Sequence, residues 1–472
     1  MPISKIKEHL VTHRHLLFVL IGCLFLSFQF PPEGITNEGW KVLTIFILTL
    51  GLIITKTFDM GVVSLIALSL CLITGAMDID FCLQNFSYQV TWLVLMAFFI
   101  SKGFILSGLG SRIALFMASK IGSTPLKLSY ALMFSEVLIA PLIPSNTARG
   151  GGLIFPIAQS LGENIFGKPH GLGRNKHHMT SYLLYNCFQS NLISSAIFLT
   201  AMAGNPMIVS MGEHFGIHIN WTDWFQAAII PGLICIFLTP LITYLILKPK
   251  KVDLNDIKQK TEDAYKQLGS FSFKEKIMTF TFCALLLAWI LGSKIGINPT
   301  AAAIIAVTFL LVTGVLSWND ISTDNQAWTT FVWLSVLFTL SAALKNHGVI
   351  GWFASGVGSF MPEANWIVLL LMLTFVNFYV HYFFASLTSH ITTFFQPLMM
   401  IGVQLAVPLK PLLLALAFST SLSAGLTHYG TGTSTIIFGA GYWNLKDWWV
   451  AGFIHSSIML LVFLAVGLPL WI

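Results

Sequence analysis

The sequence has few charged residues. Only 9% of its 472 residues are charged, whereas 56% are hydrophobic and the mean hydropathy is +0.79. A soluble domain is usually about 25% charged, because its surface faces water. This composition therefore excludes a water-soluble enzyme. It also excludes a disordered chain, because 13% of the residues are aromatic, too many for a solvated polymer. We predict a polytopic membrane protein.

Cysteine, metal and nucleotide chemistry have no support in the sequence. The six cysteines lie scattered in or beside apolar runs without a Cys-x-x-Cys pair, so neither a disulfide framework nor a metal site follows. The sequence has no GxxxxGK[ST] loop to cradle nucleotide phosphates and no HExxH motif to hold a catalytic zinc ion. We expect no cofactor, no metal, no enzymatic activity and no nucleic-acid partner.

Eleven apolar runs approach the roughly 20 residues that a helix needs to cross a bilayer. They are 16–30, 41–56, 60–76, 89–107, 181–203, 222–247, 277–294, 299–316, 328–346, 410–427 and 448–471. A basic segment precedes the first run without a small-residue cleavage site, so we interpret that run as an anchor rather than a signal peptide. The runs lack the alternation of outer-membrane strands.

Lysine and arginine predict the orientation. Basic residues gather in the amino-terminal segment and in the polar segment 248–276, which six spans separate. Both segments therefore lie on one side, and the positive-inside rule makes that side the cytoplasm. The loop 317–327 also falls inside although it contains no base, which is a small exception. We predict a multi-pass protein of the bacterial inner membrane, with membrane lipid as a partner, a cytoplasmic N terminus and an external C terminus.

The two halves of the chain repeat a pattern. The segment SNTAR at 145–149 precedes SLTSH at 386–390 by 241 residues, and Pro156 precedes Pro397 by the same number. We name these segments the first tip (145–149) and the second tip (386–390). Each copy holds five full spans by our count, an odd number, so the second copy enters the membrane from the opposite side. Inverted repeats are common in secondary transporters, which bind substrate where the copies meet.

This repeat divides the chain into four parts. Residues 1–40 form an N-terminal cytoplasmic segment, the first span and an outer loop, and residues 41–247 form repeat 1. Residues 248–276 form a charged cytoplasmic connector, and residues 277–471 form repeat 2. In each repeat we expect scaffold spans first, to about residue 125 or 360, and then a hairpin and a broken span.

Regions 126–165 and 364–407 each hold two apolar arms around a polar centre. Each region is either two ordinary spans joined by an outer loop or a re-entrant hairpin, and topology does not decide between them. We favour hairpins, because Pro144 ends one helix, Ser and Asn cap the next, and three glycines permit close approach. Irregular backbone at membrane depth must line a cavity or lie buried in protein. The expected fold is all-α, with about 11 transmembrane helices and two opposed re-entrant hairpins in an inverted repeat.

Two interrupted spans accompany the tips. In the first break (200–207, TAMAGNPM), Gly204 interrupts the helix, and Asn205 and Pro206 are expected as N-cap and first residue of a second half. In the second break (427–435, THYGTGTST), two glycines interrupt the matching span. Each break starts a half-helix whose unpaired N–H groups attract an anion. The alternative for any single Ser, Thr or Gly is close helix packing.

The candidate substrate-binding residues come from both tips and both breaks. They are Ser145, Asn146, Thr147, Arg149, Gly204, Asn205, Ser386, Thr388, Ser389, His390, Gly430, Thr431, Gly432 and Thr433. Arg149 stands out, because a charge in an apolar stretch is costly unless it is paired or faces water. The alternative is that Arg149 snorkels to the interface. His390 takes the equivalent position in repeat 2, and we assign no role to Glu136 on the first hairpin arm.

These motifs resemble those of the divalent anion:sodium symporter family over almost the whole chain, and most closely its exchanger branch. That branch contains bacterial citrate/succinate and tartrate/succinate antiporters and plastid 2-oxoglutarate/malate translocators. Residues 145–147 match the family's Ser-Asn-Thr signature in full, whereas Leu387 stands where sodium-coupled members have Asn. The resemblance implies substrate carboxylates at the tips, sodium there in the symporters, a homodimer, and an elevator-like movement of a transport domain against a scaffold.

The departure at Leu387 predicts a mechanism. A leucine offers no oxygen to a hard cation, while Arg149 and His390 place cationic or ionisable groups two residues beyond the threonine of each tip. We predict that these groups replace sodium. The protein would then exchange dicarboxylates (succinate, malate, fumarate, 2-oxoglutarate or related di- and tricarboxylates) without sodium. The alternatives are a sodium- or proton-coupled symporter, a membrane-embedded enzyme using His390 or His428 as a base, and a channel.

Overall fold

The computed structural model contains helices and no strands among the residues that it describes. The described residues are 21–23, 25, 26, 28–55, 58–166, 178–248, 257–349, 351, 352, 356 and 364–472. The predicted span 16–30 and the predicted connector 248–276 lie partly outside them.

The helices of the first half run from α2 to α11. They are α2 (Asn37–Ile54), α3 (Met60–Ile73), α4 (Ile79–Gln84), α5 (Gln89–Ser107), α6 (Leu109–Ile121), α7 (Pro125–Ile139), α8 (Phe155–Phe166), α9 (Met179–Ile197), α10 (Gly204–Glu213) and α11 (Trp221–Leu247). A π-helix, η3 (Thr147–Ile154), leads into α8.

The helices of the second half follow the same order after the connector helix. They are α12 (Ile257–Lys266), α13 (Phe273–Ile295), α14 (Pro299–Val312), α15 (Trp318–Ser322), α16 (Asn325–Asn346), α18 (Trp366–Val380), α19 (Leu387–His390), α20 (Gln396–Gln404), α21 (Leu409–Ser423), α22 (Gly432–Gly439) and α23 (Leu445–Trp471). A second π-helix, η6 (Ile391–Phe395), leads into α20.

Each half contains the same series of elements. Two helices come first (α2 and α3, or α13 and α14), then a short helix (α4 or α15), a long helix (α5 or α16), a hairpin, a broken helix (α9–α10 or α21–α22) and a final helix of 27 residues (α11 or α23). The first half also has α6 between the long helix and the hairpin, and the matching part of the second half lies mostly outside the described residues. Even the caps correspond, because Asn220 accepts from the N–H of Asp223 at the start of α11, as Asn444 does from that of Asp447 at the start of α23. The opposite membrane orientation of the two copies stays a prediction.

Long apolar helices confirm the membrane class. Among the described residues, seven helices are long and apolar enough to span a bilayer: Gln89–Ser107, Pro125–Leu142, Trp221–Leu247, Phe273–Gly292, Asn325–Asn346, Trp366–Phe383 and Leu445–Trp471. Three shorter apolar helices correspond to further predicted spans, namely Met60–Ile73, Pro299–Val312 and Leu409–Ser423. The chain is therefore an integral, multi-pass membrane protein.

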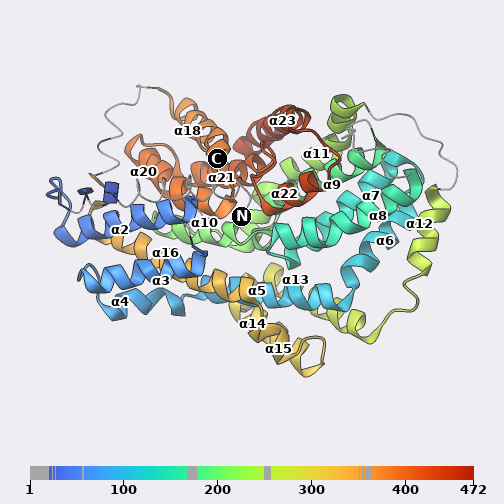
Figure 1. Cartoon of the computed structure of the whole chain (residues 1–472), viewed down its shortest axis with the longest axis horizontal. Helices are drawn as coiled ribbons and strands as arrows, with labels where there is room; N and C mark the ends of the chain where they lie inside the picture. Colours follow the sequence, from blue (N-terminus) through green and yellow to red (C-terminus); the bar gives the residue numbers. More distant parts are fainter. Residues whose placement is uncertain are drawn as a thin grey trace, which may run out of the picture.

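The two halves interleave in space. Figure 1 shows α16 (orange) between α2 and α3 (blue), and all three helices are in contact. The final helices α11 and α23 also pack against each other, and α11 contacts α9 as well. Elements that are far apart in the sequence therefore form one body around the site.

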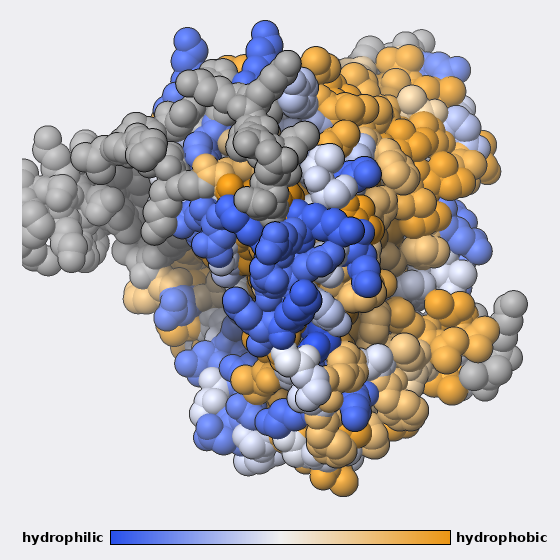
Figure 2. All heavy atoms as spheres, turned by 90° about the vertical axis from the view of Figure 1, so that its right-hand side faces the viewer, coloured by the Kyte–Doolittle hydropathy of each residue, from blue (hydrophilic) through white to orange (hydrophobic). Residues whose placement is uncertain are grey.

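The surface has both apolar and polar areas. Figure 2 views the side on which α12 lies in Figure 1 and shows hydrophilic side chains beside a broad hydrophobic area. Large apolar side chains elsewhere are exposed to a degree that water would penalise, among them Leu245 (70%), Ile305 (67%) and Val312 (82%). Such exposure is typical of helices that cross a membrane.

The connector is anchored to the first half. Arg112 on α6 forms an ion pair with Glu275 at the start of α13, at 2.5 Å, and donates to the carbonyls of Gly269 and Ser270. The helix α12 lies within the segment that we predicted as a charged connector, and it packs against α6 and α8. The anchor fixes where the second half begins relative to α6.

Candidate functional site

The two tips meet at one cavity. It has a volume of about 560 Å³ and is lined by both tips and both breaks. Eight of the predicted site residues line it: Ser145, Asn146, Thr147, Gly204, Ser386, Thr388, Thr431 and Gly432. The other six predicted residues do not line it: Arg149, Asn205, Ser389, His390, Gly430 and Thr433.

The opposite side of the cavity comes from scaffold helices, which contain none of the predicted site residues. Its residues are Asp59 and Met60 at the amino end of α3, Phe98 of α5, and Asn325, Gln326, Thr329, Thr330 and Trp333 in the first half of α16. Gln326 reaches across, and its Nε2 lies 3.4 Å from Oγ of Ser145. Self-comparison matched only Trp333 among these residues, since Trp92 precedes it by 241 positions, and it gave no signal for the others.

Both tips are built in the same way. At the first tip, Oγ of Ser145 accepts a hydrogen bond from the N–H of Ala148 at 3.2 Å. At the second tip, Oγ of Ser386 accepts from the N–H of Ser389 at 3.5 Å. A short π-helix follows each cap, and short π-helical segments are frequent at functional sites. The predicted capping role of Ser145 is confirmed.

The first tip packs against the second break. Nδ2 of Asn146 donates to Oγ1 of Thr431 at 3.2 Å, and Oγ1 of Thr433 donates to the carbonyl of Asn146 at 2.9 Å. Gly432 lies so close to Thr147 that an added Cβ atom would be 2.5 Å from Oγ1 of Thr147. Only glycine fits there without a shift of the tip.

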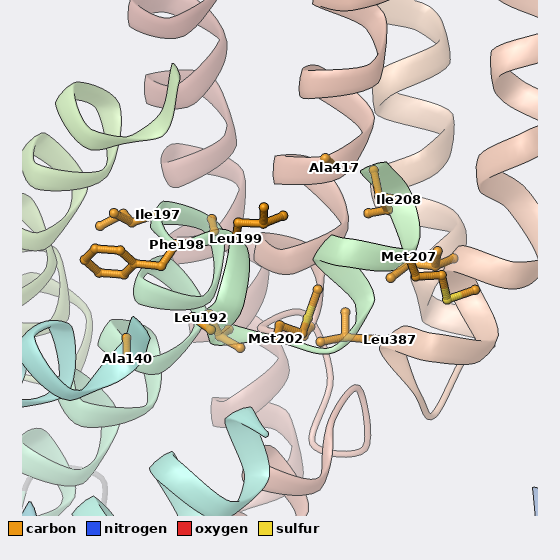
Figure 3. Packing of buried hydrophobic residues seen from close by; sticks show 14 of the residues in the cluster. Ala140, Leu192, Ile197, Phe198, Leu199, Met202, Met207, Ile208, Leu387 and Ala417 are labelled. Carbon is orange, nitrogen blue, oxygen red and sulfur yellow. The ribbon is translucent and has the colours of Figure 1, made fainter. Parts of the chain in front are cut away.

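The second tip packs against the first break in turn. An added Cβ atom on Gly204 would lie 2.4 Å from Cδ1 of Ile391, in the π-helix that follows the second tip. Figure 3 shows Met202 of the first break beside Leu387 of the second tip, and both residues line the cavity. Each tip therefore rests on the broken helix of the other half, which is what brings all four segments to one place.

The first break differs from its prediction. The helix α10 begins at Gly204, its N-cap residue is Ala203, and no side chain caps it. The predicted N-cap role of Asn205 is therefore wrong. Instead, Nδ2 of Asn205 donates to the carbonyls of Ser195 and Phe198, at 2.7 and 3.0 Å, because α9 ends there with carbonyls that need partners.

Arg149 is enclosed behind the first tip. Its side chain is fully buried and forms an ion pair with Glu136 at 2.5 Å. It also donates to the carbonyls of Ile143 and Ala201, at 2.6 and 2.7 Å, and to Oγ of Ser195 at 2.8 Å. The snorkelling alternative is wrong, because protein surrounds the guanidinium. Glu136 also neutralises the guanidinium, so Arg149 by itself does not leave the empty protein with an uncompensated positive charge.

His390 is enclosed behind the second tip. Its Nδ1 lies 3.1 Å from Nδ1 of His381, whose Nε2 lies 3.1 Å from the carbonyl of Gly430. A carbonyl only accepts, so Nε2 of His381 carries a proton, and in a neutral pair its Nδ1 accepts from Nδ1–H of His390. His381 was not among the predicted residues, although it lies directly before the second tip.

A further residue pair extends the correspondence between the halves. Glu136 and Asn377 lie 241 residues apart, as the tips do. Glu136 accepts from Asn191 and Ser194 on α9, and Asn377 donates to Ser419 and Thr420 on α21. Each therefore fixes a hairpin arm to the first part of a broken helix. The same offset could have identified Asn377 from the sequence.

Fold and site together are those of a membrane transporter rather than of an enzyme. The chain matches the family described as "Sodium:sulfate symporter transmembrane region" over residues 8–472. It therefore belongs to the divalent anion:sodium symporter family.

Named relatives cover nearly the whole chain. It is 38% identical to the "Putative malate transporter YflS" of Bacillus subtilis, over 97% of this chain and 95% of the relative. It is 37% identical to "Dicarboxylate transporter 1, chloroplastic" of Arabidopsis thaliana, over 95% of this chain and 81% of the relative. It is 31% identical to the "Inner membrane protein YbhI" of Escherichia coli, over 97% of this chain and 96% of the relative.

Two solved structures share the fold. The YdaH transporter of Alcanivorax borkumensis gives a TM-score of 0.58 at 13% identity, over 82% of this chain and 86% of that one. MtrF of Neisseria gonorrhoeae gives a TM-score of 0.54 at 13% identity, over 96% of this chain and 97% of that one. At this identity the likeness concerns the fold alone.

Proposed function

We propose that this protein exchanges dicarboxylate anions across a bacterial inner membrane, independently of sodium, by an elevator-type movement. The observation that carries the proposal is the cavity at which two tips and two breaks converge. The names of the relatives support the substrate class, since one is a putative malate transporter and another a dicarboxylate transporter.

The cavity suits a molecule with a carboxylate at each end. The half-helices α10 and α22 begin at it, at Gly204 and Gly432. Their first N–H groups have no partner within the helix and carry the positive end of the helix dipole. Thr147 and Thr388 add hydroxyl donors from the two tips. We propose that these groups hold the two carboxylates and that the six predicted residues behind the cavity support them.

Sodium independence rests on what fills the space behind the first tip. The guanidinium of Arg149 donates hydrogen bonds to the carbonyls of Ile143 and Ala201 and to the hydroxyl of Ser195. Carbonyl and hydroxyl oxygens are ligands that hard cations prefer. A cation would therefore compete with a side chain that is already bound, while at the second tip Leu387 offers it no oxygen.

Strict exchange needs a reason other than the net charge of Arg149, which Glu136 neutralises. We propose that the helix ends supply it. When the cavity is empty, those N–H groups at the starts of α10 and α22 that have no acceptor in the protein must lose water during the movement without gaining one, and such loss is costly at membrane depth. The N–H of Asn205 is not among them, because it donates to the carbonyl of Met202 at 3.0 Å. A bound dianion provides the acceptors, so the loaded carrier moves more readily.

The resemblance also supplies the remaining parts of the proposal. We propose a homodimer in which the tips and breaks move against α2–α5 and α13–α16. In the predicted orientation, the amino ends of α3 and α16 lie on the cytoplasmic side, so the cavity faces the cytoplasm.

Counterflow in proteoliposomes tests this function. Purified full-length protein should take up labelled succinate, malate or 2-oxoglutarate when the vesicles contain an unlabelled dicarboxylate, at the same rate with and without sodium. Uptake into empty vesicles driven by a sodium gradient would refute exchange and favour the symporter. A proton gradient that drives the same net uptake would favour proton coupling.

A further inference from the structure

The cavity contains a charge of unexpected sign. Among its described lining residues, the only ionisable side chain is a carboxylic acid, Asp59. The two basic candidates of the tips, Arg149 and His390, do not line it. A cavity proposed for anions therefore presents a carboxylate on the side opposite the tips.

The Asp59 carboxylate accepts no hydrogen bond from the N–H groups at the start of its own helix. Asp59 is the N-cap residue of α3, but its side chain accepts no capping hydrogen bond. Asp78 provides a contrast, since its carboxylate accepts from the N–H of Phe81 at the start of α4. Asp59 is exposed, lines the cavity and accepts no capping bond, so its negative charge faces an occupant of the cavity.

Asp59 lies at the start of α3, which packs against the scaffold helix α16. An added Cβ atom on Gly61, two residues further on, would lie 3.6 Å from Cγ2 of Thr329 on α16. Thr329 and Thr330 also line the cavity. The carboxylate therefore lies on the scaffold side, whereas the helix ends that attract anions lie on the side of the tips.

We propose that Asp59 is a specificity-determining residue that admits dianions and disfavours trianions. This inference rests on the proposed function. The tips and breaks hold two carboxylates, and a third carboxylate must project away from them, toward the scaffold side. There it meets a like charge. One extra unit charge at about 6 Å in a hydrated cavity changes binding by roughly three- to tenfold.

The test compares citrate with succinate as competitors of labelled succinate exchange in proteoliposomes of the full chain. Asp59→Asn keeps the size of the side chain and removes its charge. The ratio of citrate to succinate potency should rise about three- to tenfold at a pH where citrate is a trianion. The rise should disappear at a pH where citrate carries two charges. Asp80→Asn is the matched control, because it removes an exposed charge from α4 outside the cavity lining and should leave the ratio unchanged.

A second measurement does not depend on the folding of the variant. In the unmodified protein, raising the salt concentration screens Asp59 and should raise the relative potency of citrate. An unchanged ratio in both experiments, with succinate exchange intact, would overturn the role of Asp59 alone. An equal rise at both pH values would also overturn it, since it would indicate a steric effect. Absence of any dicarboxylate exchange by the unmodified protein would instead refute the proposed function, and this inference with it.

Discussion

Arg149 and Glu136 determine the polarity of the region behind the first tip. A buried guanidinium is tolerated there because one carboxylate and several carbonyl and hydroxyl oxygens accept hydrogen bonds from its N–H groups. The second half places Asn377 and His390 at the corresponding positions. A charged pair in one half thus corresponds to an amide and an imidazole in the other. The sequence indicated that Arg149 needs a partner, but only the structure identified it.

Removing one member of the Arg149–Glu136 pair should be more damaging than removing both. Arg149→Met and Glu136→Gln should each destabilise the protein by about 3–5 kcal/mol, because each leaves an uncompensated buried charge. The double variant should lose less than either single variant, because it leaves no uncompensated buried charge. Thermal unfolding in detergent, combined as a double-mutant cycle, measures this coupling. Additive losses would show that the two charges do not depend on each other.

The broken helices and the tips act as one unit at the scale of elements. The hydrogen bond from Asn146 to Thr431 joins residues 285 positions apart, and that from Thr433 to Asn146 joins residues 287 apart. Self-comparison predicted that the tips and breaks correspond. It did not predict that each tip packs on the break of the other half, because an offset relates equivalent segments and carries no information about contacts between different ones.

The close approach of Gly432 to the first tip gives a prediction with a control on the same helix. Gly432→Ala should abolish or strongly reduce exchange, because the new methyl group would lie 2.5 Å from Oγ1 of Thr147 and displace the first tip. Gly439→Ala, at the other end of α22, meets nothing within 4 Å and should leave transport unchanged. Succinate counterflow with matched amounts of protein checks both. Equal activity of the two variants would show that the first tip tolerates displacement.

At the scale of the whole molecule, the arrangement of the membrane helices depends on an orientation that composition alone predicts. The connector helix α12 should lie in the cytoplasm, because basic residues accumulate on that side. The segment between α10 and α11 should then lie outside, because the single span α11 separates it from the connector.

Cysteine labelling tests this orientation. Lys258→Cys should react with a membrane-impermeant maleimide only in inside-out vesicles, whereas His218→Cys should react only in right-side-out vesicles, because both positions are exposed but lie on opposite sides. The unmodified protein is the control, since five of its six cysteines are buried and Cys283 lies in a membrane-spanning helix. The reverse pattern would invert the whole topology and turn the cavity toward the outside.

The sequence by itself determined the membrane class, the repeated order of elements, and the positions of tips and breaks. Hydropathy, proline, glycine and capping residues act over one or two helical turns, so they can be read locally, as at Ser145 and Gly432. Only the tertiary structure decided which polar residues face the cavity and which lie behind it. Arg149 is paired with Glu136, Asn205 donates to a carbonyl near the end of α9, and Asp59 lines the cavity from α3, where no motif was identified. Side-chain partners in this fold come from elements far apart in the chain, and local pattern does not encode such pairings.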